Sequence, residues 1–180
     1  MGSAGSGTEE VSRQLLAAYG LSYDDIDARF LTFSESAASL RDGAIDGAII
    51  SVGYPAAAVL EATTTGGARL LSFEADRVEA LRERYPYYSP GTIPMGTYSG
   101  MEKDVATVAM MNWIVALETL DGEVVTGLLN ILRERRESLE QVHEMAEQMD
   151  LGALADSPIP LHPATEAWLA GAGLSGRVPE

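Results

Sequence analysis

The sequence predicts an α/β fold with a parallel sheet covered by helices. Short runs rich in β-branched and aromatic residues alternate with longer segments whose apolar residues recur at helical spacing. Glycine or proline stands at most of the boundaries between these segments. Alternating strands and helices are typical of parallel strands joined by crossover helices, so we expect this architecture for the first half of the chain.

The first half opens with a glycine-rich turn that leads into a helix. Gly20 is placed to end this helix, and Gly43 to end the next one, because glycine readily adopts the left-handed conformation found just after a helix. Pro55 is expected near the first position of a third helix. In order, the predicted elements are helix 8–19, strand 28–33, helix 35–42 capped by Ser34, strand 45–51, a helix after Pro55, strand 69–73 and helix 75–84.

A change in composition divides the chain near residues 85–91. Three tyrosines and two prolines at 85–90 predict a stiff, extended connector. We therefore expect residues 1–88 to form a nearly complete α/β lobe and residues 89–180 to belong to the other lobe, which is incomplete. The elements expected in the second part are strands 92–98 and 105–117, a helix that begins at Asp121, a charged helical stretch at 137–149 and a short helix at 165–170.

The protein is acidic, and its composition narrows the function classes. The 180 residues carry 12 basic and 27 acidic side chains, which gives a formal net charge of −15. Nucleic-acid binding normally requires a basic face and is therefore disfavoured. Without cysteine there is no disulfide and no thiolate metal site or nucleophile. No apolar run is long enough for a membrane span, and no signal peptide is evident at Met1.

Five segments resemble one family of transport receptors. They are GSAGSGT at 2–8, FSESAASLRDGAIDGAI at 33–49, VGYPAAAV at 52–59, RYPYYSPGTIPMGTYSG at 84–100 and IPLHPATEAW at 159–168. In this order they resemble the solute-binding receptors of TRAP transporters of the TRAP-associated extracytoplasmic immunogenic (TAXI) type. The resemblance implies a type II periplasmic-binding-protein-like fold, with one nearly complete lobe and the C-terminal part of the other. By this resemblance, residues 1–88 are the second ligand-binding lobe, and residues 89–180 are the returning C-terminal portion of the first lobe with its C-terminal helices. It also implies that the N-terminal part of an extracytoplasmic receptor is lacking, so we expect a fragment of a longer protein.

Three strand-to-helix junctions are candidates for a ligand site. Ligands of open α/β sheets bind at the carboxyl ends of strands, where helix N-termini offer free N–H groups to anions. The candidate ligand-binding residues are Gly5, Ser6, Gly7 and Thr8 in the first junction, Ser34 in the second, and Ser51, Gly53 and Tyr54 in the third. By the resemblance, a ligand carboxylate would dock on the Gly5–Thr8 turn. Glu9 and Glu10 count against an anion there, Ser34 could be a helix cap only, and Tyr54 could pack on Pro55.

The sequence thus favours a binding protein over an enzyme. We expect a receptor for a small anionic solute, such as a glutamate-like or dicarboxylate compound, whose other partners are the membrane subunits of a TRAP transporter. No cofactor, metal or catalytic residue is expected, because the two histidines lack metal-ligand spacing and no G-x-S-x-G elbow is present. His162 is expected to be structural. An enzyme on the same fold and a degenerate fragment without transport function remain the alternatives.

Overall fold

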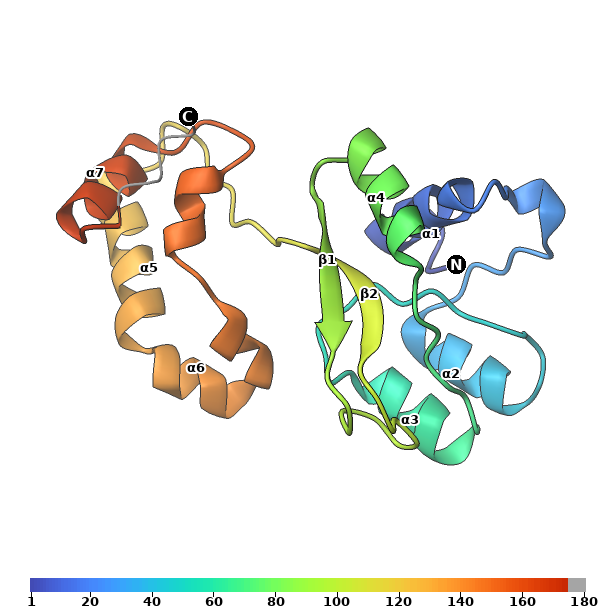
Figure 1. Ribbon diagram of the computed structural model, residues 1–180. Coiled ribbons are helices and arrows are strands. Elements are labelled where there is room, and N and C mark those ends of the chain that lie inside the picture. The colour runs from blue at the N-terminus through green and yellow to red at the C-terminus, as the bar shows by residue number, and fades with distance from the viewer. Residues whose placement is uncertain (175–180) are drawn as a thin grey trace. The chain divides into compact units, whose positions relative to one another are not determined.

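The chain folds into two compact units. The computed structural model describes residues 1–174, apart from the side chain of Glu144. The first unit comprises Met1–Asn112 and the second begins at Trp113 (Figure 1). Each unit has its own cluster of buried apolar side chains.

The first unit contains four α-helices, and sequence signals at their ends explain their bounds. They are α1 (Gly7–Ala18), α2 (Phe33–Arg41), α3 (Ala57–Thr65) and α4 (Ala75–Arg84), with a short 3-10 helix η1 (Tyr23–Asp25) after α1. Gly20 and Gly43 have φ of 73° and 68° just past α1 and α2, as predicted. The predicted bounds of α4 are confirmed at both ends.

The sheet of the first unit is a two-stranded antiparallel hairpin. Strand β1 (Tyr88–Ile93) pairs with β2 (Val105–Met110) in the register Tyr88↔Met110 to Ile93↔Val105. At Gly91 the partner strand lies close, since a Cβ there would be 3.1 Å from the Thr107 side chain. In the connecting loop, the Met95 N–H donates to Asp104 Oδ1 at 2.8 Å.

The predicted parallel sheet is not observed in the described residues. The segments 28–32, 45–51 and 69–73 lie in irregular structure, and α2 begins at Phe33, inside the predicted strand 28–33. The segment 69–73 makes one hydrogen bond of the kind found between strands, in which the Phe73 N–H donates to the Ala106 carbonyl of β2 at 3.1 Å. The predicted strands 92–98 and 105–117 are also corrected, because β1 begins earlier at Tyr88 and β2 ends earlier at Met110. The mixed α/β content is confirmed, and the type II arrangement of two lobes stays a prediction.

The tyrosine-rich segment lies inside the first unit. Tyr88 is buried with Leu15 of α1 and Leu81 of α4, and Phe73 and Val108 pack against this cluster. The division between compact units at Asn112 therefore does not coincide with the predicted boundary between 88 and 89. The assignment of these segments to the lobes of a longer receptor stays a prediction.

The second unit is helical in the described residues. It contains α5 (Gly122–Glu134), α6 (Arg136–Val142), the 3-10 helices η2 (Glu144–Gln148) and η3 (Gly152–Asp156), and α7 (Pro163–Gly171). Asp121 caps α5 as predicted, with its Oδ1 accepting from the Glu123 N–H at 2.8 Å. The predicted helical stretch 137–149 is divided at His143, which has an extended backbone and caps η2. The core is formed by Val125, Leu129, Trp168 and Leu169.

Candidate functional site

In the glycine-rich turn before α1, a backbone N–H donates to a carboxylate in the first turn of the same helix. Gly5 has φ of 74°, and its N–H donates to Glu9 Oε2 at 2.6 Å. Ser6 is the N-cap, with its Oγ accepting from the Glu9 N–H at 3.2 Å. The Gly5 N–H lowers the pKa of Glu9 below its ordinary value, and Arg13 lowers it further from 2.7 Å. A carboxylate is therefore already bound where a ligand carboxylate was predicted.

Thr8 of the same turn is buried against the chain just before it. A Cβ on Gly2 would lie 2.7 Å from the Thr8 Cβ, so only glycine fits there without a shift. Gly7 is exposed, and Ser6 is half-buried. The turn is thus held in one conformation by Gly2, Ser6 and Glu9.

At the start of α2, backbone N–H groups are also hydrogen-bonded to side chains of the same segment. The cap is Thr32, not Ser34 as predicted: its Oγ1 accepts from the Glu35 N–H at 3.3 Å, and its N–H donates to Glu35 Oε2 at 2.8 Å. This reciprocal pair is a capping box. The Thr32 N–H and hydroxyl together lower the pKa of Glu35. Ser34 lies exposed in the first turn, one position inside the helix.

The start of α3 differs from the other two. Ser51, Gly53 and Tyr54 are half-buried in the irregular segment before it, and the N-cap is Ala56, which provides no side-chain hydrogen bond. The first turn of α3 holds no acidic residue. The Ala56 N–H donates to the hydroxyl oxygen of Tyr98 at 3.0 Å.

Tyr98 is a residue that reasoning from the sequence missed as part of this junction. It lies in the loop between β1 and β2, is 4% exposed, and reaches a helix start 42 residues earlier in the chain. Burial raises its pKa. The sequence placed Tyr98 at the end of a predicted strand 92–98, and no local signal pointed to α3.

The structure places all eight predicted site residues in the first unit, in or before the first turn of a helix. Packing of α2 on α3 brings two of the three helices together, and Arg41 joins Glu61 by an ion pair of 2.9 Å. Within residues 1–174, no hydrogen bond or ion pair links one junction directly to another. Convergence of the eight residues on one solute stays a prediction.

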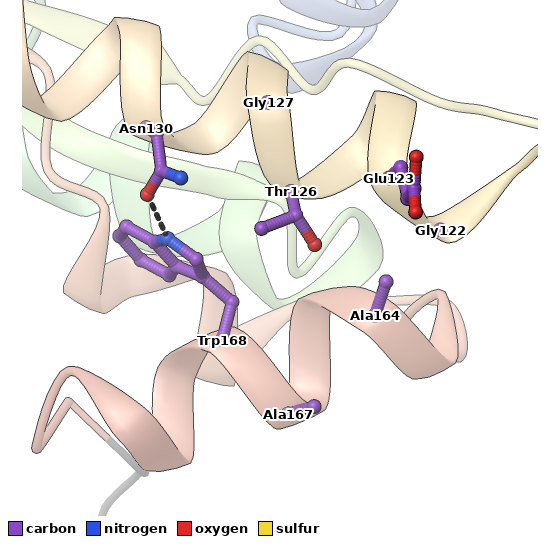
Figure 2. Close-up of a pocket in the computed structure, with 8 residues that line it drawn as sticks. All are labelled: Gly122, Glu123, Thr126, Gly127, Asn130, Ala164, Ala167 and Trp168. Carbon is purple, nitrogen blue, oxygen red and sulfur yellow. Dashed lines mark hydrogen bonds between the residues drawn. The ribbon is translucent and has the colours of Figure 1, made fainter.

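The second unit carries an open groove of about 600 Å³ between α5 and α7. Figure 2 shows its lining, in which Asn130 Oδ1 accepts from Trp168 Nε1 at 2.8 Å. The Arg133 guanidinium lies 5.0 Å from the centre of the Trp168 ring. The groove is lined by Gly122, Glu123, Thr126, Gly127, Asn130, Ala164, Ala167 and Trp168. None of these was a predicted site residue, and the polar contacts that cross the groove serve the packing of α7 on α5.

His162 has a structural position, as expected. Its Nδ1 accepts from the Ala164 N–H at 3.1 Å and so caps α7, while its Nε2 lies 3.0 Å from the Leu120 carbonyl. Both contacts together require the neutral tautomer that carries its proton on Nε2. Within residues 1–174, histidine and carboxylate side chains form no cluster suited to a metal ion. None of the helices described there combines the length and apolar character of a membrane span.

A comparison with models of protein families shows which family the chain belongs to. The model of the NMT1-like family matches residues 1–173, almost the whole chain. The chain belongs to the NMT1-like family. This is a periplasmic-binding-like family of extracytoplasmic solute-binding proteins, which confirms the coarser part of the sequence-based prediction. The narrower assignment to TAXI-type receptors stays a prediction.

Proposed function

We propose that this NMT1-like chain is the solute-binding part of an extracytoplasmic receptor for a TRAP-type secondary transporter. It captures a small organic acid or amino-acid-like anion and presents it to the membrane subunits of that transporter. The observation that carries the proposal is the family match over residues 1–173. The five TAXI-like segments support the finer assignment to a TRAP system.

Binding in such a site requires no chemistry on the solute. Backbone N–H groups at helix starts and hydroxyl groups can hold a carboxylate by hydrogen bonds alone. Of the eight predicted residues, Gly5–Thr8 and Ser34 lie at the starts of α1 and α2, and Ser51, Gly53 and Tyr54 precede α3. The proposed receptor therefore binds and releases its solute unaltered, and the alternative is an enzyme that consumes it.

A ligand screen followed by product analysis tests this function. Thermal unfolding of the chain is measured with L-glutamate, succinate and related acids, with glycerol as a neutral control. A solute that binds the folded state raises the midpoint in a concentration-dependent way. Proton NMR of the mixture after long incubation should then show the compound unchanged. Consumption of the compound would favour the enzyme, and a protein stabilised by none of the acids would contradict the proposed solute class.

A further inference from the structure

We propose that the outer face of α5 is a dimerisation surface, on which the α5 helix of a second copy of this chain docks antiparallel. The surface is a stripe formed by Asp121, Val124, Leu128, Ile131 and Arg135. Association through this stripe does not depend on the proposed solute site, because the stripe lies in the second unit and all eight predicted site residues lie in the first.

The stripe has the spacing of a seam between two helices. Its members follow one another at intervals of three, four, three and four residues, the spacing of the core positions of a coiled coil. At 3.6 residues per turn, they fall within about 80° of the helix circumference. Val125 and Leu129, which are buried against α7, lie on another part of that circumference. Helix α5 therefore has one apolar face that α7 covers and a second apolar face that remains exposed.

The centre of the stripe is apolar. The exposed fractions are 57% for Val124, 40% for Leu128 and 56% for Ile131. A contiguous apolar patch with charged residues at its rim is typical of a protein–protein contact. Three side chains on one helix offer less than the about 800 Å² per partner of a standard interface. We therefore expect a weak dimer, which dissociates at the micromolar concentrations of an unfolding experiment.

The ends of the stripe carry opposite charges, which determine the direction of docking. Asp121 caps the N-terminus of α5, and Arg135 is the cap residue at its C-terminus. Both are exposed, and the Arg135 guanidinium has no hydrogen bond or ion pair within residues 1–174. An antiparallel second helix places Asp121 of each copy opposite Arg135 of the other and opposes the two helix dipoles. A parallel helix would bring like charges together at both ends.

The stripe is complementary to itself about its midpoint. Asp121 lies seven residues before Leu128, and Arg135 lies seven residues after it. A two-fold axis at Leu128 therefore pairs Asp121 with Arg135, Val124 with Ile131, and Leu128 with itself. Such an isologous contact closes on itself, so it gives a dimer and not a filament. The two Asp–Arg pairs attract at the contact, although each copy carries a net charge of −15.

Sedimentation velocity of the 180-residue chain tests the dimer. Over a roughly hundredfold range of concentration, up to about 0.5 mM, we expect a reversible monomer–dimer equilibrium, because small interfaces associate weakly. Leu128→Glu sets two carboxylates face to face on the two-fold axis and should weaken association more than about tenfold. Val142→Glu is the matched control, since Val142 is 83% exposed in the same unit but lies off the stripe, and it should leave association unchanged.

Cysteine cross-linking tests the antiparallel register, because the natural chain has no cysteine. Under mild oxidation, Leu128→Cys should form a disulfide-linked dimer faster than Val142→Cys, which measures random collisions. Val124→Cys should link to itself no faster than that control, but should link to Ile131→Cys when the two variants are mixed. A disulfide needs Cα atoms within about 7 Å, so these rates separate the two directions of docking.

The two measurements together keep the test valid if Leu128→Glu disturbs folding, which far-UV circular dichroism checks. A chain that stays monomeric over the whole concentration range would overturn the inference and leave the stripe to a different partner. Unchanged association of a folded Leu128→Glu variant would also overturn it. So would self-linking of Val124→Cys as fast as that of Leu128→Cys, since only a parallel pair predicts it. None of these outcomes bears on the solute screen, which tests the proposed function separately.

Discussion

Gln14 joins α1 to the tyrosine-rich segment through a buried polar network. Its Oε1 accepts from the hydroxyls of Tyr88 and Tyr87, at 2.7 and 3.0 Å, and its Nε2 donates to Glu10 Oε1 at 2.9 Å. Gln14 is 5% exposed, and burial raises the pKa of Tyr88. Because each polar atom of the Gln14 amide has a partner, the hydrogen bonds offset the cost of burying it, and the network fixes the position of α1 beside β1.

We expect Gln14→Leu to destabilise the first unit by about 1–3 kcal/mol. The substitution leaves the buried Tyr88 hydroxyl without its acceptor, and this loss costs more than the hydrogen bond itself contributes. Urea unfolding followed by tyrosine circular dichroism measures the effect. In the double variant Gln14→Leu/Tyr88→Phe, the unsatisfied hydroxyl is gone, so most of the stability should return. Equal destabilisation of both variants would show that packing, not the unsatisfied hydroxyl, is responsible.

Glu9 should make the stability of the first unit depend on acidity. Its pKa is lowered in the folded state, chiefly by the Gly5 N–H. The unfolded state therefore binds a proton at higher pH than the folded state does. The stabilisation is complete above the ordinary glutamate pKa of about 4.3 and is lost as pH falls through the lower folded value.

Unfolding free energies measured across this acidic range should fall less steeply for Glu9→Gln than for the natural chain. Glu102→Gln serves as the control for removal of one negative charge, because Glu102 is an exposed loop residue with no hydrogen bond or ion pair within residues 1–174. Parallel pH profiles for the natural chain and Glu9→Gln would show that the Gly5–Glu9 contact does not contribute.

At the scale of elements, most helices were predictable, whereas of the predicted strands only 92–98 and 105–117 correspond to observed ones, with the start at Val105 correct and the other bounds shifted. The bounds of α4, the cap at Asp121 and the glycines after α1 and α2 follow from local chemistry, so sequence alone locates them. A strand exists only with a partner, and the apolar run 45–51 does not specify one. The same limit applies to the candidate site. The three helix starts were predictable, whereas the Tyr98 contact depends on a pairing 42 residues apart in the chain.

The missing cap of α3 predicts a stabilising substitution. Ala56 has the extended backbone of an N-cap, with φ of −113° and ψ of 134°, and its side chain provides no acceptor. Ala56→Ser should add a cap hydrogen bond and raise the free energy of unfolding by about 0.5–1 kcal/mol. Thr32→Ala, which removes the cap of α2, should lower it by a similar amount. Chemical denaturation of the two variants and the natural chain measures both changes, and an unchanged or lower stability of Ala56→Ser would contradict this assignment of the cap.

Truncation of two adjacent leucines of α5 should change the stability to very different extents. Leu129 is buried against α7, whereas Leu128 lies on an exposed apolar stripe with Val124 and Ile131. Leu129→Ala should lower the free energy of unfolding by about 2–5 kcal/mol. Leu128→Ala should change it by no more than about 0.5 kcal/mol. Unfolding followed by tryptophan fluorescence measures both. A large effect of Leu128→Ala would indicate that another surface covers the stripe in solution.

At the scale of the whole molecule, the two units have separate cores and separate spectroscopic signals. Leu15, Leu81 and Tyr88 centre the first core, and residues of α5 and α7 form the second. All seven tyrosines lie before residue 99, and both tryptophans lie after residue 112. Tyrosine signals therefore follow the first unit, and tryptophan emission follows the second.

We predict that the two units unfold in distinguishable transitions. Since each unit buries its own apolar side chains, a core truncation in one unit should lower the stability of that unit only. Leu81→Ala should shift the tyrosine circular dichroism transition to lower urea concentration and leave the tryptophan transition in place, and Leu129→Ala should do the reverse. The natural chain, monitored by both signals in one titration, is the reference. Coincident shifts of both signals in either variant would show that the two units unfold as a single cooperative structure.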